Sequence, residues 1–102
     1  MQRHSRKKIE ITIAESYVDR VAAILDRHDV KGFTVLHAFM GRGAGGSWRD
    51  TGLTRADQHV VMVAVIGTEA ASAIMDDLAK FFTTHHGIVT LSDVEVIRGE
   101  RF

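Results

Sequence analysis

The chain has 102 residues, 45% of them hydrophobic and 25% charged, which is the composition of one small globular domain. Its 13 basic and 13 acidic residues cancel, so no overall charge draws it to nucleic acid or to an anionic membrane. It has no cysteine, which excludes disulfides, thiolate nucleophiles and cysteine metal sites. No apolar run approaches the ~20 residues of a membrane helix, and the sequence therefore predicts a cytoplasmic protein.

The first half of the chain predicts a tail, a strand, a helix and a second strand. Residues 1–7 are basic without an apolar period, which favours a flexible tail over an arm for nucleic acid or a membrane. Residues 8–102 are then expected to form a single domain. In 8–14, isoleucines alternate with polar residues as in a half-buried strand. Apolar residues in 15–28 follow the helical period, and 33–40 are rich in β-branched and aromatic residues.

The second half predicts a long loop followed by strand, helix and strand. Residues 41–58 hold five of the nine glycines and no apolar period, so we expect a loop there. Residues 59–67 are almost continuously apolar, which indicates a central strand. A helical apolar face spans 68–86. In the last strand, 88–98, the apolar phase changes near Ser92, which predicts a β-bulge.

The order β-α-β-β-α-β predicts an α+β, ferredoxin-like fold, a four-stranded antiparallel sheet with both helices on one face. The other face of the sheet would then expose apolar side chains. A small domain usually buries such a face against another copy of itself, so we expect an oligomer.

The loop opens on a glycine motif, and the loop as a whole has more than one interpretation. Gly41, Gly43 and Gly46 match the dinucleotide-binding pattern G-x-G-x-x-G, but no helix is predicted to begin after Gly46, so we reject a nucleotide turn of the Rossmann type. Trp48 and the loop arginines favour a mobile recognition loop, because Trp and Arg are enriched where partners bind. The alternative is that Trp48 folds back onto its own subunit.

The remaining polar residues predict no catalytic or metal centre. We find no nucleophile with a base and an orienting group, so no enzyme activity is expected. The six histidines are scattered, and the adjacent His85 and His86 lack a third ligand at suitable spacing for zinc. Near the end of the chain, Arg98 and Arg101 flank Gly99. They are equally compatible with a phosphate clamp and with ordinary surface ion pairs.

Four segments in this order resemble the PII superfamily of trimeric signalling proteins: KGFTV at 31–35, GRG at 41–43, FFTTHHGIV at 81–89 and EVIRGERF at 95–102. The likeness is closest to the PII-like branch associated with bicarbonate transporters and carboxysomes, and it covers residues 8–102. It implies that 41–58 are the T-loop, a mobile arm that engages partners. It also implies that 83–87 are the B-loop and 98–102 the C-terminal loop.

The resemblance implies an adenine nucleotide in each cleft between neighbouring subunits. The implied nucleotide-binding residues are Thr34, Gly41, Arg42, Gly43, Gly87, Ile88, Val89, Arg98 and Arg101. The implied anion- and partner-binding residues of the T-loop are Gly45, Gly46, Ser47, Trp48 and Arg49. The B-loop sequence TTHHG has no lysine, unlike the classical family pattern, which favours AMP, ADP or cyclic AMP over tightly bound ATP.

The function that this resemblance implies is that of a homotrimeric regulator. It would bind adenine nucleotide, with bicarbonate as a second ligand, and would need no cofactor or metal. Its T-loop would act on a bicarbonate transporter or a carboxysome-associated protein, and no nucleic acid would be bound. Two alternatives remain open at this point. One is a small dimeric cofactor-free oxygenase, and the other is a nucleic-acid-binding module that uses Phe33 and Phe39 on its sheet.

Overall fold

The computed structural model describes residues 1–43, 46–49 and 58–101. The strands are β1 (His4–Ala14), β2 (Thr34–Ala38), β3 (Met40–Gly43), β4 (Gly46–Arg49), β5 (His59–Ile66) and β6 (Gly87–Val96). The helices are α1 (Val18–Arg27) and α2 (Ala71–Phe81), and short 3₁₀ turns occupy Glu15–Tyr17 and Gly99–Arg101. Within the described residues, neither helix is long and apolar enough to cross a membrane.

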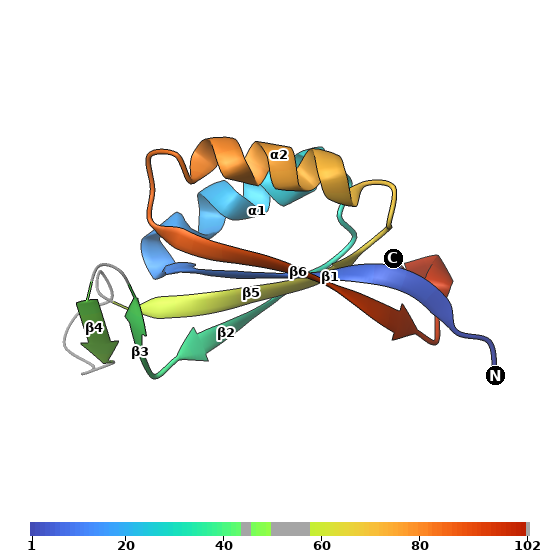
Figure 1. Cartoon of the computed structure of the whole chain (residues 1–102), viewed down its shortest axis with the longest axis horizontal. Coiled ribbons are helices and arrows are strands. Elements are labelled where there is room, and N and C mark those ends of the chain that lie inside the picture. The colour runs from blue at the N-terminus through green and yellow to red at the C-terminus, as the bar shows by residue number, and fades with distance from the viewer. Residues whose placement is uncertain (44–45, 50–57, 102) are drawn as a thin grey trace.

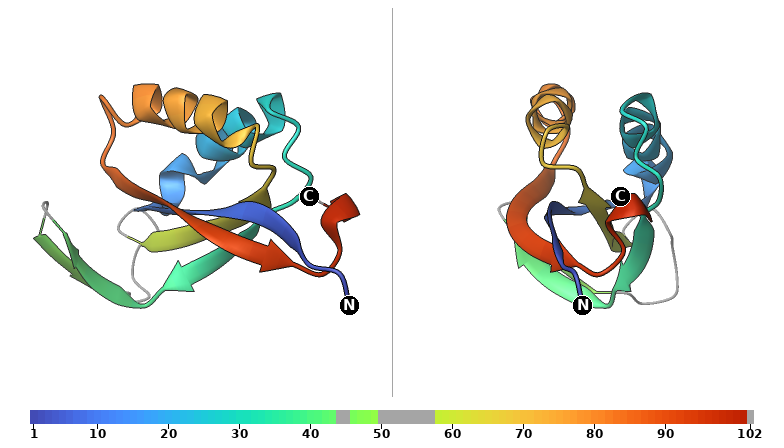
Figure 2. Two further views of the ribbon diagram at one scale, coloured as in Figure 1. Left: turned by 45° about the vertical axis from the view of Figure 1, so that its right-hand side comes forward. Right: turned by 90° about the vertical axis from the view of Figure 1, so that its right-hand side faces the viewer.

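Four strands form one antiparallel sheet in the order β2-β5-β1-β6, and both helices cover the same face of it (Figure 1; Figure 2). This arrangement confirms the predicted ferredoxin-like fold. The core lies between the sheet and the helices, and its alternating strand residues are fully or almost fully buried because every second side chain faces the helices. The core residues are Ile9, Ile11, Ile13, Val21, Ile24, Leu25, Val60, Met62, Ala64, Ile66, Ala71, Ile74 and Leu78.

The predicted tail is wrong for residues 4–7, which belong to β1. His4 pairs with Val96 and Lys7 with Asp93, so this segment extends the sheet along β6. Its side chains are polar because neither helix covers this end of β1, where they are exposed or half-buried. A strand that is not buried on one face needs no apolar alternation, and periodicity alone could not detect it.

The predicted bulge in the last strand is also wrong. The register between β1 and β6 runs without interruption from His4↔Val96 to Ile13↔Gly87. The apolar phase changes because the two halves of β6 place their apolar residues on opposite faces. Leu91 lies opposite the core residue Ile9, whereas Val94 lies opposite Arg6 on the face that the helices leave uncovered.

Part of the predicted loop forms a hairpin that projects from one end of the sheet (Figure 1). Strands β3 and β4 pair from Met40↔Arg49 to Gly43↔Gly46. Gly46 has a φ of 112°, a conformation that strongly favours glycine, which explains one glycine of the motif. The hairpin is held by backbone pairing, so it required no apolar period in the sequence.

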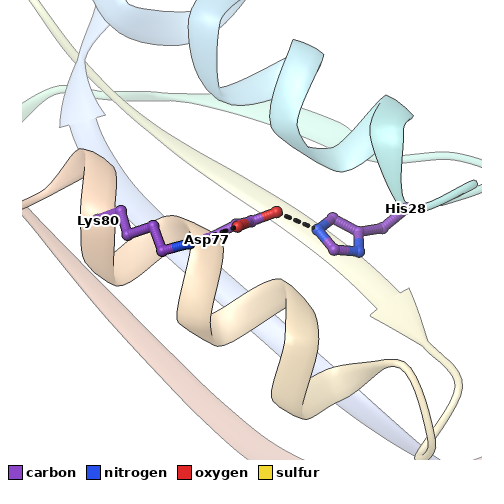
Figure 3. A network of polar contacts seen from close by, with 3 residues as sticks. All are labelled: His28, Asp77 and Lys80. Atoms are coloured by element: carbon purple, nitrogen blue, oxygen red, sulfur yellow. Dashed lines mark hydrogen bonds and ion pairs between the residues drawn. The ribbon is translucent and has the colours of Figure 1, made fainter.

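A polar contact joins the two helices across the top of the domain (Figure 3). His28, at the end of α1, places Nε2 2.6 Å from Oδ2 of Asp77 on α2. Lys80 approaches the other carboxylate oxygen at 3.8 Å. The hydrogen bond from His28 is the main reason that the pKa of Asp77 lies below its ordinary value of 3.8, and burial opposes it in part.

Replacing Asp77 with asparagine should therefore destabilise the fold in a pH-dependent way. A carboxyl group whose pKa is lowered by folding stabilises the protein at pH values above its unfolded pKa, and this contribution is lost as the pH falls through the folded pKa. The wild type should unfold at a higher temperature than Asp77→Asn near pH 6, and the gap should narrow below about pH 4. Thermal melts across this pH range measure the difference in melting temperature between the two proteins. Asp76→Asn, at an exposed position on the same helix, is the control. A gap that is independent of pH would contradict the assignment.

Candidate functional site

A cavity of about 380 Å³ lies at the end of the sheet that carries the hairpin. Four segments far apart in the sequence meet there: the end of β1 with the following 3₁₀ turn, the β3–β4 hairpin, the first residue of β5, and the residues that begin β6. The lining residues are Thr12, Ile13, Ala14, Tyr17, Gly43, Gly46, Ser47, His59, His86, Gly87 and Ile88. The register places them together, because Ala14 pairs with His59 and Ile13 pairs with Gly87.

The hairpin contributes glycine backbone and one ordered side-chain contact to the cavity. Gly43 and Gly46 are the last pair before the turn of the hairpin, and their backbone N–H groups, free of side chains, allow close approach of a ligand. Arg42 Nε donates a hydrogen bond of 3.0 Å to Oγ of Ser47, which lines the cavity. Arg42 is otherwise exposed and therefore adds positive charge beside the opening.

On the opposite wall, Gly87 is required by close packing. A Cβ atom at this position would lie 2.2 Å from Cε1 of Phe82 and 2.9 Å from Cγ2 of Ile13. Real Cβ atoms do not approach other heavy atoms so closely, and Ile13 is almost fully buried in the core and cannot retreat. The helix predicted over 68–86 is shorter in the structure, because α2 ends at Phe81, and Gly87 is the first residue of β6.

The turn before Gly87 is anchored by His85. Its ring stacks on Phe81 at a centroid distance of 4.1 Å and meets the Tyr17 ring edge-on at 5.0 Å. Arg20 Nη1 lies 3.0 Å from Nε2 of His85, and Nδ1 of His85 lies 2.9 Å from the carbonyl oxygen of Phe81. Arginine can only donate, so Nε2 accepts and Nδ1–H donates, which assigns the neutral Nδ1–H form of the imidazole.

The structure brings together only part of the set of residues implied by the resemblance. Gly43, Gly87 and Ile88 of the nucleotide set line the cavity, as do Gly46 and Ser47 of the loop set. Gly41 and Arg42 on β3 and Val89 on β6 are neighbours in the chain of lining residues but do not line the cavity themselves. Trp48 and Arg49 belong to β4, and their side chains lie outside what the structure describes. Thr34 lies on β2 opposite Val63, outside the cavity. Gly45 lies outside the described residues.

The two arginines of the set lie at the other end of the sheet. Strand β6 has 10 residues between the cavity and the C-terminal turn, so at ~3.3 Å per residue it separates them by about 30 Å. The backbone of both residues therefore lies far from the cavity of their own subunit.

Several cavity residues were not predicted from the sequence. Thr12, Ala14, Tyr17 and His59 belong to no motif. His86 lies in the segment that resembles the B-loop, but it is not among the implied nucleotide-binding residues. They meet because three strand ends share one edge of the sheet, a signal that needs the register. Among the described residues, no three His, Asp or Glu side chains converge as a metal site.

Comparison with protein families decides what kind of protein this is. The family model described as nitrogen regulatory protein P-II matches residues 6–101. The chain belongs to the P-II family. P-II proteins are regulatory proteins rather than enzymes, so the cofactor-free oxygenase is excluded, and the predicted signalling class is confirmed at this level.

Solved structures of PII-like proteins superpose on this P-II chain over almost its whole length. CPII of Thiomonas intermedia K12, bound to ADP, AMP and bicarbonate, has a TM-score of 0.92 at 25% identity, covering 99% of this chain and 96% of its own. CPII bound to ADP and bicarbonate has a TM-score of 0.90 at 26% sequence identity, and the match covers 99% of this chain and 97% of that one. A protein of Thermus thermophilus, described as a PII-like signalling protein, has a TM-score of 0.86 at 23% sequence identity, and the match covers 100% of this chain and 99% of that one. Because of this low identity, the match supports the fold alone. No curated protein sequence matches the chain.

Proposed function

We propose that this P-II protein is a homotrimer that binds AMP, ADP or cyclic AMP at the cavity and signals through residues 41–58. The observation that carries the proposal is the cavity itself, which lies between the turn end of the hairpin and Gly87 and Ile88. Its volume of about 380 Å³ falls in the range of small-molecule sites. A ligand that contacts both walls would favour one hairpin arrangement over others, which is how binding could become a signal.

The charge distribution supports a site that is completed by a neighbouring subunit. Within the described part of the chain, no lysine or arginine lines the cavity, so a bound phosphate lacks a strong cationic partner there. Arg98 and Arg101 lie about 30 Å away along β6 in the same subunit, an estimate from strand geometry. We infer that they approach the phosphates from the adjacent subunit.

The uncovered face of the sheet supports the trimer. Leu36 pairs with Val61 and Ile88 pairs with Thr12, which places both on the face away from the helices. Leu36 is 53% exposed and Ile88 58% exposed in the single chain. Apolar side chains of this size are usually buried in an oligomer interface.

Bicarbonate and the protein partner complete the proposal. CPII binds bicarbonate together with ADP. In this chain Arg42 and Ser47 place a guanidinium and a hydroxyl group beside the cavity, a suitable pair for a small oxyanion. We propose that the ligand-dependent hairpin engages a bicarbonate transporter or a carboxysome-associated protein, as the resemblance to that branch implies. The protein would then act in the cytoplasm, beside that partner.

A thermal-shift screen against AMP, ADP, ATP and cyclic AMP, each with and without bicarbonate, tests the proposal. A ligand that binds only the folded state at 100 times its Kd adds about 2.7 kcal/mol to the free energy of unfolding, which raises the melting temperature by several degrees. Light scattering should give three times the monomer mass of 11.3 kDa. No shift with any of these nucleotides would contradict the function, and a dimer would contradict the site.

A further inference from the structure

The C-terminal turn, Gly99–Arg101, packs onto the first residues of β1. Strand β5 pairs with β1 only from Lys7 onward, so the segment from His4 to Arg6 pairs with β6 alone (Figure 2). Gly99 is buried against this segment. A Cβ atom at Gly99 would lie 2.7 Å from Cγ of His4 and 2.8 Å from Nη2 of Arg6. The backbone of the turn therefore sits directly on two side chains of the segment that the sequence predicted as a tail.

Two cations from different elements hold the turn by its carbonyl groups. Arg6 Nη2 donates a hydrogen bond of 2.8 Å to the carbonyl oxygen of Gly99. Lys31 Nζ, from the connection between α1 and β2, donates one of 3.1 Å to that of Glu100. The contact to Gly99 is partly buried, which makes it the stronger restraint, and the contact to Glu100 is exposed.

Arg98, the arginine that follows β6, differs from Arg6 in its exposure and in its hydrogen bonding. Arg98 is exposed and has no polar partner within the described part of the chain. It is adjacent to the buried Gly99, so the contact between Arg6 and Gly99 restricts the backbone from which Arg98 projects. A side chain held in this way loses less conformational freedom when it binds a ligand, which increases affinity.

We propose that Arg6 is a positioning residue for the nucleotide site of the adjacent subunit. It holds the C-terminal turn so that Arg98 is presented to the phosphate groups of the nucleotide in the neighbouring cavity. The proposal rests on the proposed function, because it needs a phosphate-bearing ligand at that cavity. It predicts that Arg6 affects binding of the phosphates but not of the adenosine part. The adenosine would contact the cavity walls of the neighbouring subunit, at the end of that subunit that lies opposite its own C-terminal turn.

Calorimetric titration of the full-length protein with ADP and with adenosine separates these contributions. We expect Arg6→Ala to weaken ADP binding about tenfold, the effect of one lost charge-assisted hydrogen bond, and to leave adenosine binding unchanged. The control is Arg3→Ala, which removes an exposed arginine from the same region, whose only described contact is a 3.7 Å ion pair with Glu95. Arg3→Ala should bind both ligands as the wild type does.

A pair of glycine variants tests the same idea by steric displacement. An added methyl group at Gly99 fits only if the turn or the side chains of His4 and Arg6 shift, whereas a Cβ atom at Gly32 meets nothing within 4 Å. Gly99→Ala should therefore weaken ADP binding as Arg6→Ala does, and Gly32→Ala should not. The triple variant Arg6→Ala/Arg98→Ala/Arg101→Ala should bind ADP no more weakly than Arg98→Ala/Arg101→Ala, because Arg6 acts through the arginines that the C-terminal turn presents.

The outcomes distinguish this inference from the function on which it rests. If the wild type binds no adenine nucleotide, the proposed function fails. If the wild type binds ADP and Arg98→Ala weakens binding while Arg6→Ala and Gly99→Ala do not, only the positioning role is wrong. Equal losses of ADP and adenosine affinity in Arg6→Ala would show general damage to the fold and would also overturn the positioning role.

Discussion

Replacing Gly87 with alanine should destabilise the domain by about 1–3 kcal/mol and greatly weaken nucleotide binding, because the added methyl group overfills a packed site. It would lie 2.9 Å from Cγ2 of the buried Ile13 and 2.2 Å from Phe82. Either β6 or the Phe82 ring must move, and Gly87 forms part of the cavity wall. Urea denaturation followed by circular dichroism measures the loss of stability, and titration with ADP at a temperature where the variant is folded measures the loss of binding.

Gly67→Ala is the matched control for this prediction. Gly67 also connects a strand and a helix, and a Cβ atom there meets nothing within 4 Å. The free energy of unfolding of Gly67→Ala should lie within about 0.5 kcal/mol of the wild-type value, and the variant should bind ADP with wild-type affinity. Wild-type stability in Gly87→Ala would show that the turn before β6 accommodates the methyl group, and the close packing at this wall of the cavity would then be wrong.

Removing both C-terminal arginines should lower the affinity for ADP by at least about 100-fold while leaving the affinity for adenosine nearly unchanged. Each charge-assisted contact to a phosphate contributes about 1.5–3 kcal/mol, and no lysine or arginine among the described residues of the cavity wall can replace it. Titration of Arg98→Ala/Arg101→Ala with both ligands checks this. The difference between ADP and adenosine should also shrink with added salt in the wild type.

Arg27→Ala is the control for the arginine pair, since it removes one exposed cation from the last turn of α1. It should leave both affinities unchanged. ADP binding at wild-type strength in the double variant would mean that the phosphates meet other groups, and the contribution of a neighbouring subunit's C-terminal loop would have to be abandoned.

The sequence predicted best the features that depend on local periodicity. The alternation of Ile9, Ile11 and Ile13 and the apolar faces of both helices indicated the sheet, the layers and the fold. Two of the errors have one physical origin, because His4–Lys7 and the β3–β4 hairpin are strands through backbone pairing with distant or polar segments. Such pairing leaves no period in the sequence.

The candidate site shows the same division. Gly43 and Gly87 were implied by the resemblance to PII proteins, and both line the cavity. Tyr17 and His59 were missed because only the register brings their strand ends to one cavity. Arg6 was assigned to a tail because its partner, the carbonyl of Gly99, lies 93 residues away in the chain.

A crystal structure of the protein with ADP and bicarbonate tests the central claim most directly. The account predicts a trimer with one ADP per cavity, the adenine ring against Gly87 and Ile88, and Arg98 of the adjacent subunit within hydrogen-bonding distance of the phosphates. ADP bound away from this cavity, or phosphates that meet no arginine of a neighbouring subunit, would contradict it.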